Sequence, residues 1–103
     1  MNKTKQSQIS DNKINTQLFF AIKNKDSSLV QSLLEQRADV NSALSSGIGE
    51  TPLMTTARVG DASIAKMLIE AKADLNIKTF YGLKAVDLAE STELQKLLNP
   101  ATP

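Results

Sequence analysis

Three carboxylates near the C-terminal end of the sequence are the first side chains that could do chemistry. Asp87, Glu90 and Glu93 recur at every third position, a spacing that brings side chains together on one side of a helix. Paired carboxylates do acid–base chemistry when their surroundings separate their pKa values. Close to the end of a terminal helix, these groups are expected to be solvated instead. The spacing alone therefore favours an exposed charged surface over an acid–base pair.

The missing residue types exclude several further kinds of site. The 103-residue sequence contains no Cys and no His. Thiolate nucleophiles and Cys-based zinc sites are thereby excluded, and the commonest general base and transition-metal ligand is absent. Ser63 and Asp61 have no His to complete a nucleophilic triad. We therefore predict that the protein is not an enzyme and that it binds no cofactor, no metal and no small-molecule substrate.

A short glycine-containing segment has a weak likeness to a phosphate-binding loop. Gly47 and Gly49 precede a predicted helix, and the N-terminus of a helix favours anions. The segment lacks the lysine that such loops use and has Glu50 in its place, and no predicted strand precedes it. A plain turn is the better interpretation.

Positive charge is concentrated at the start of the chain. Residues 1–25 carry five lysines against one aspartate, so their net charge of +4 leaves −3 on the remainder of a chain whose total is +1. Polar residues without aromatics surround these lysines, which predicts a flexible solvated tail over residues 1–14. The alternative is an arm that binds nucleic acid or another acidic surface.

The sequence shows no pattern typical of export or membrane insertion. Its first fourteen residues lack the apolar run of about 7–15 residues found in secretory signals. No segment approaches the roughly 20 apolar residues of a membrane-spanning helix. We expect a cytoplasmic protein that does not bind membranes, with a secreted effector lacking a classical signal as the alternative.

Two segments of the chain are copies of one unit. Residues 26–41 and 61–76 align without gaps at an offset of 35, and seven of the sixteen positions are identical. About one identity is expected by chance at ordinary residue frequencies. The shared residues are Asp26/Asp61, Ser28/Ser63, Leu33/Leu68, Glu35/Glu70, Ala38/Ala73, Asp39/Asp74 and Asn41/Asn76. An internal repeat of this length is typical of stacked-repeat proteins.

Each copy predicts two short helices. Thr51-Pro52 provides an N-cap and a first-turn proline for a helix that runs to about Arg58, where Gly60 ends it. Asp61 or Ser63 then caps a second helix that runs to about Ala71. Its apolar positions are Ile64, Met67, Leu68 and Ala71, and the first copy has Leu29, Val30, Leu33 and Leu34. Both sets follow the spacing of one helix face, which indicates a core between stacked helices.

A third and shorter copy follows the first two. Residues 83–89 are similar to the start of the second copy, and residues 94–98 are similar to its second helix. Asn99-Pro100 ends this last helix, because proline cannot continue it. With only 4% aromatic residues, the core must be mainly aliphatic. Leu33, Leu34, Leu68, Ile69, Leu97 and Leu98 are expected to form it.

The middle unit resembles the ankyrin repeat family over its whole length. The matching residues are Gly49–Leu53, Ala57, Gly60-Asp61, Ile64–Glu70 and Ala73–Asn76. The resemblance implies an all-α ankyrin-repeat solenoid of helix-turn-helix units joined by β-hairpin-like loops. It covers residues 15–99, with repeats at about 15–45, 46–78 and 79–99, and it leaves 100–103 as a C-terminal tail.

The sequence departs from the family pattern at three places. Met54 stands where the family usually has His, so the family's Thr–His hydrogen bonding is expected to be lost. Arg37 and Lys72 replace glycines, and each costs about 1 kcal/mol if its backbone is left-handed. The segment Ala43–Glu50 has two extra residues, which predicts a looser first loop.

The resemblance implies a module that binds another protein through hairpin tips and a concave helix face. Carried over position by position, the contact residues are Lys23, Asn24, Gly47, Ile48, Glu50, Arg58, Val59, Phe80, Tyr81 and Leu83. The partner's identity stays open, nucleic acid is only the alternative partner, and the free protein is expected to be monomeric. Phe80 and Tyr81 fall in a predicted exposed turn, where clustered aromatics are typical of binding surfaces. In the alternative, Phe80 folds back onto the last unit as a cap.

Overall fold

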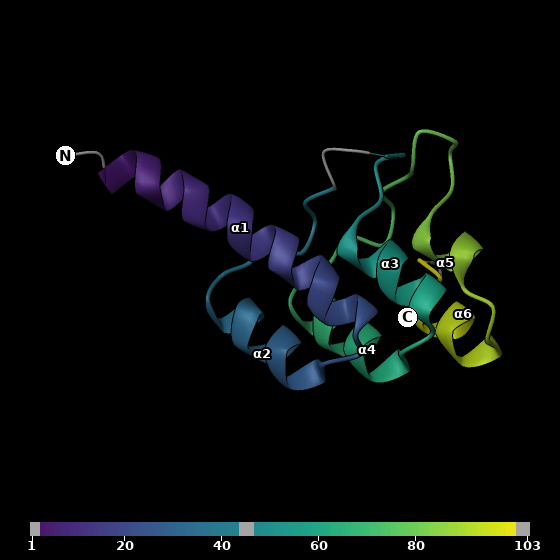
Figure 1. The fold of residues 1–103 in the computed structure, drawn as a ribbon. Coiled ribbons are helices and arrows are strands. Elements are labelled where there is room, and N and C mark those ends of the chain that lie inside the picture. Colours follow the sequence, from purple (N-terminus) through teal and green to yellow (C-terminus); the bar gives the residue numbers. More distant parts are fainter. Residues whose placement is uncertain (1–2, 44–46, 101–103) are drawn as a thin grey trace.

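The chain folds into three consecutive helix pairs (Figure 1). The structure, a computed structural model, describes residues 3–43 and 47–100, with side chains from residue 13 onward. Over these residues its helices are α1 Lys3–Lys23, α2 Ser27–Glu35, α3 Pro52–Val59, α4 Ala62–Glu70, α5 Ala85–Leu88 and α6 Thr92–Leu98. The described backbone has no strand, which confirms the all-α prediction.

The helix pairs stack into two layers. Helix α3 contacts both α1 and α5, and α4 contacts both α2 and α6. Within each unit the two helices also contact each other, as α1 with α2, α3 with α4 and α5 with α6. One layer therefore consists of α1, α3 and α5, and the other of α2, α4 and α6 (Figure 1). The predicted leucine core lies between them: Leu33, Leu68 and Leu98 are buried, and Leu34, Ile69 and Leu97 pack against them.

Asp26 and Asp61, which occupy equivalent positions in the two copies, cap helices α2 and α4. The Asp26 carboxylate accepts the N–H of Leu29 at 3.1 Å, and Asp61 accepts the N–H of Ile64 at the same distance. Asp61 rather than Ser63 is therefore the cap of α4. A side chain at this position satisfies one of the unpaired N–H groups of the first turn, which stabilises a helix by about 1 kcal/mol.

The residues at the start of α3 reveal how the chain accommodates methionine in place of histidine. The Thr51 hydroxyl accepts the N–H of Met54 at 3.4 Å, and the Met54 sulfur accepts the N–H of Thr51, also at 3.4 Å. The thioether is a weak acceptor, but it gives the Thr51 N–H a partner in a buried place. All residues from Pro52 to Ala57 are buried, as expected for a helix with neighbours on both sides.

One position of the predicted apolar stripe is exposed. Leu29 retains 41% of its accessible surface, whereas the equivalent residue Ile64 is completely buried. The prediction that Leu29 belongs to the core is therefore wrong. Helix α2 lies at one end of its layer and contacts α4 on one side, whereas α4 lies between α2 and α6. The same residue position is thus covered in the middle of the stack and open at its end.

Asparagine and aspartate side chains hold the turns that follow α2 and α4. The side chain of Asn15 accepts the N–H of Asp39 at 2.7 Å, and that of Asn41 accepts the N–H of Asp74 at 2.7 Å. Each aspartate also accepts an N–H two residues later, from Asn41 at 2.9 Å and from Asn76 at 2.8 Å. The aspartates fix each turn. The Asn41 bond also ties the turn after α4 to the unit before it, whereas Asn15 ties the turn after α2 to α1 of the same unit.

Helix α1 includes most of the segment for which the sequence predicts a flexible tail. The helix begins at Lys3, and its N-terminal part extends beyond the other helices (Figure 1). The division of the chain at residue 14 stays a prediction. The looser loop expected over Ala43–Glu50 falls partly on residues 44–46, which lie outside the described residues.

Three long side chains, those of Lys25 (φ 56°), Arg37 (φ 71°) and Lys72 (φ 75°), have a left-handed backbone that favours glycine. Arg37 and Lys72 thus meet the condition under which the sequence predicts a cost in stability. Arg37→Gly and Lys72→Gly are each expected to raise the free energy of unfolding by about 1 kcal/mol, because glycine adopts this backbone without a Cβ clash. Urea denaturation followed by circular dichroism measures the change.

The matched control for these substitutions is Lys66→Gly, which introduces the same residue type inside α4. It is expected to lower the free energy of unfolding by about 1 kcal/mol, because glycine weakens a helix interior. A loss of stability in all three variants would contradict the left-handed strain at residues 37 and 72.

Candidate functional site

Helices α1 and α3 frame a hollow on the surface of the layer that consists of α1, α3 and α5. It has a volume of about 410 Å³ and is lined by Lys23, Glu50, Thr55, Arg58 and Val59. Four of these residues, all except Thr55, were predicted as contact residues from the sequence. The structure brings them together, although Lys23 is 27 positions away from Glu50 in the chain. We call these five residues the groove.

A charge pair organises the groove. The Arg58 Nη1 atom lies 2.7 Å from Glu50 Oε1, and the Thr55 hydroxyl donates to Glu50 Oε2 at 2.7 Å. The Glu50 side chain is only 13% exposed, whereas that of Arg58 is 57% exposed. Both carboxylate oxygens therefore have a donor, and Glu50 holds the guanidinium in place. Sequence reasoning missed Thr55, because its role depends on where the Glu50 side chain lies.

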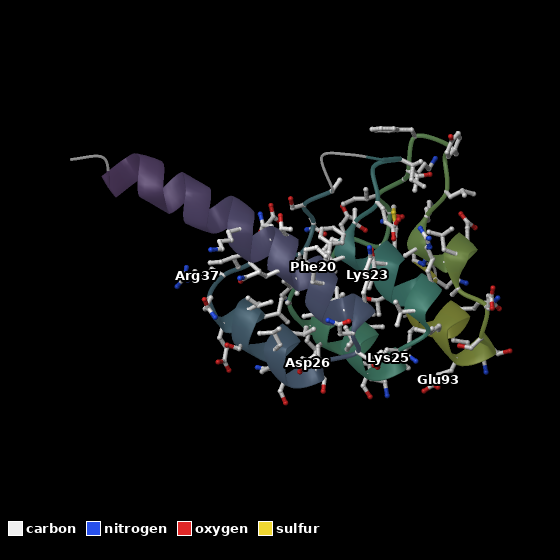
Figure 2. The ribbon with its side chains drawn as sticks, in the orientation of Figure 1. Phe20, Lys23, Lys25, Asp26, Arg37 and Glu93 are labelled. Atoms are coloured by element: carbon white, nitrogen blue, oxygen red, sulfur yellow. The ribbon has the colours of Figure 1, made fainter. Side chains whose placement is uncertain are left out.

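An exposed aromatic residue lies beside the groove. Phe20 is 59% exposed, whereas its neighbour Phe19 is 4% exposed and packs inside. Phe20 precedes Lys23 by one helical turn, and Figure 2 shows both residues on α1 next to α3. Adjacent residues on a helix point about 100° apart, so the two phenylalanines project in different directions, and Phe19 is the one that meets the core. Asn24, a predicted contact residue, is exposed just after α1 ends.

The turn between α4 and α5 presents two aromatic side chains to solvent. Phe80 is 81% exposed, Tyr81 is 75% exposed and Leu83 is 37% exposed. Thr79 is buried, and its hydroxyl accepts the N–H groups of Tyr81 and Leu83, both at 3.2 Å. Its own N–H donates to the Leu83 carbonyl at 2.8 Å. We call residues 79–83 the aromatic tip. Its backbone is closed by hydrogen bonds, so the aromatic residues have a defined place.

The aromatic tip is joined to the segment that precedes α3. The N–H of Phe80 donates to the Ile48 carbonyl at 2.8 Å. Gly49 has φ 82°, and a Cβ atom there would lie 3.0 Å from the Cε1 atom of the Phe80 ring. The ring thus covers Gly49 and not the last unit, so Phe80 is not a terminal cap. Gly47, another predicted contact residue, is exposed.

The carboxylates Asp87, Glu90 and Glu93 have separate places and do not form an acid–base pair. The Asp87 side chain accepts the N–H of Lys84 at 2.8 Å and so caps the start of α5, and Glu90 and Glu93 are exposed. Within residues 3–43 and 47–100, no three acidic side chains gather as a metal ion would require. No helix in the described part of the chain is both long enough and apolar enough to cross a membrane.

Comparison with known proteins identifies the repeat. A family model of ankyrin repeats in three copies matches residues 8–99. The match confirms the resemblance stated from the sequence, and it begins before the predicted boundary at residue 15. No curated protein matches the chain significantly.

Proposed function

The chain belongs to the ankyrin repeat family, and from this premise we propose that it is an adaptor, inhibitor or regulator that binds a partner protein through the groove and the aromatic tip. Ankyrin repeats are generally protein–protein interaction modules and are typically not enzymes. Beyond this general role, we propose a specific binding surface on this chain, which consists of the groove and the aromatic tip. In this proposal the free protein is monomeric.

The aromatic tip is the observation that carries the proposal. Phe80 and Tyr81 each keep three quarters or more of their surface exposed, and large exposed apolar side chains that cluster are typical of binding surfaces. Aromatic residues are also enriched among the few side chains that dominate binding energy. Because hydrogen bonds to Thr79 and Ile48 fix the backbone of the tip, little backbone entropy is lost when a partner docks.

The groove lies on the same layer of helices and offers a second contact. Lys23 and Arg58 are exposed there, and Val59 is half-buried. A partner that spans both places would contact residues from all three units, which is how a stacked array forms an extended binding surface.

Affinity capture tests this function directly. The immobilised full chain is incubated with an extract of its native host, and captured proteins are identified by mass spectrometry. The variant F80A/Y81A is expected to retain the captured partner about 30-fold less well, since each of two central aromatics commonly contributes 1–2 kcal/mol or more.

The matched control is Leu29→Ala, which removes an exposed apolar side chain from α2 in the other layer. It is expected to leave capture unchanged. If F80A/Y81A captures the same protein as well as the unmodified chain does, the tip has no part in binding. If capture fails equally with Leu29→Ala, the loss is not specific to the aromatic tip and the proposed binding surface is wrong.

A further inference from the structure

The proposed function leaves open which partner chemistry the groove accepts, and the following inference rests on that function. We propose that the groove binds an acidic peptide segment, in which a carboxylate side chain lies next to an apolar one. The carboxylate bonds to Lys23 and Arg58, and the apolar side chain packs on Phe20 and Val59.

The charges of the groove select an anion. Three charged side chains line it, namely the cations Lys23 and Arg58 and the carboxylate Glu50. Both oxygens of Glu50 already accept hydrogen bonds, at 2.7 Å each. Its negative charge therefore holds Arg58 in place. Lys23 and Arg58 still have N–H donors that can bind a ligand.

Unused donors are present on both cations. The Lys23 side chain has no hydrogen bond and no ion pair with any residue in the described part of the chain. Arg58 uses its Nη1 atom for Glu50, and its guanidinium carries further N–H groups, at a side chain that is 57% exposed. A carboxylate between these residues would gain charge-assisted hydrogen bonds from two helices.

Each of these two donor residues has an apolar neighbour on its own helix. Phe20 is 59% exposed one turn before Lys23 on α1 (Figure 2). Half-buried Val59 follows Arg58 on α3. An acidic residue bound between the cations would therefore place its neighbours against an aromatic ring or an aliphatic side chain. The hollow of about 410 Å³ is near the small end of ligand pockets, so it accepts one or two side chains.

The same features disfavour nucleic acid. A nucleic-acid strand carries a charge on every phosphate, whereas the groove has two cations, one of which is already paired with Glu50. A single carboxylate needs only the donors of Lys23 and Arg58. A peptide with isolated acidic residues among apolar ones is therefore the complementary ligand.

A peptide titration followed by amide NMR tests the inference. The probe is a capped peptide of about twelve residues in which glutamate and leucine alternate between serines, long enough to cross two helices about 10 Å apart. Two further peptides replace every glutamate by glutamine or by lysine. The glutamate peptide is expected to shift the amide signals of residues 23, 55, 58 and 59, and to bind roughly tenfold more tightly than the glutamine peptide. Its affinity is expected to fall as NaCl rises from about 50 to 300 mM.

Two charge-matched variants localise the binding. Lys23→Gln is expected to weaken binding of the glutamate peptide by about fivefold or more, whereas Lys66→Gln, an exposed lysine on α4, changes it less than about twofold. Thermal unfolding of each variant verifies that the chain remains folded. Equal loss in both variants, or equal affinity for the glutamate and glutamine peptides, would overturn the inference.

Failure of the inference can be told apart from failure of the proposed function. If the glutamate peptide does not bind but capture of a partner still depends on Phe80 and Tyr81, the module binds proteins and the acidic preference of the groove is wrong. Sedimentation of the free chain tests whether a second copy of the chain occupies the groove. Self-association that Lys23→Gln abolishes would mean that a second copy fills the groove, and it too would overturn the inference.

Discussion

Removal of residues 78–103 is expected to abolish the cooperative unfolding transition of the remaining chain. This segment contains α5 and α6, which contact α3 and α4 respectively. It supplies Ala85, Ala89, Leu94 and Leu98 to the core. Two buried leucines alone contribute roughly 3–6 kcal/mol, which is comparable with the whole stability of a small domain. The truncated chain would also expose apolar surface of α4 around Met67 and Leu68.

Circular dichroism during heating measures this outcome, with the full-length chain in the same buffer as the reference. The shortened chain is expected to have less helix at low temperature and a broad, sloping melt, or to aggregate. Three units are the usual minimum for a stable stack, because each unit covers the apolar side of the next. A truncated chain with full helicity and a sharp melt would show that two units suffice here.

Leu68→Ala is expected to lower the free energy of unfolding by about 3 kcal/mol. Leu68 is fully buried in α4, the helix that contacts α2, α3 and α6. Replacement of a buried leucine by alanine loses the transfer energy of the removed methyl groups and leaves a cavity. For a domain of this size, the midpoint of thermal unfolding should fall by roughly 15 °C.

Leu29→Ala is the control for this substitution, because it removes the same atoms from the equivalent helix of the first unit. Leu29 is 41% exposed, so its truncation should cost less than about 1 kcal/mol. Calorimetry or chemical denaturation compares the two variants. Similar losses at both positions would mean that Leu29 is covered in solution and that the end of the stack is not open there.

The candidate site combines features that the sequence predicted with features that it did not. The contact residues Lys23, Glu50, Arg58 and Val59 were predicted by resemblance, and they line one hollow. Their role in binding stays a prediction. The bond from Thr55 to Glu50, which fixes the carboxylate, was not predicted. It depends on side chains whose positions follow only from the way the segment before α3 enters the helix.

The sequence by itself determined the repeat and the two helices of the second unit. Gly60 ends α3 as expected, Asp61 is one of the two cap candidates for α4, and Arg37 and Lys72, which stand where the family prefers glycine, are left-handed. These features depend on interactions within a few residues of the chain, so the residue types alone specify them. Comparison of one copy with the next then made each local signal stronger.

Only the tertiary structure decided which apolar side chains are covered. Phe19 is buried and Phe20 is exposed, and Ile64 is buried although the equivalent Leu29 is not. The contact between Phe80 and Gly49 likewise joins segments about thirty residues apart. The burial of a side chain depends on which helices lie beside it, and a unit at the end of a stack lacks one neighbour. Identical positions in a repeated sequence therefore become core in one unit and exposed surface in another.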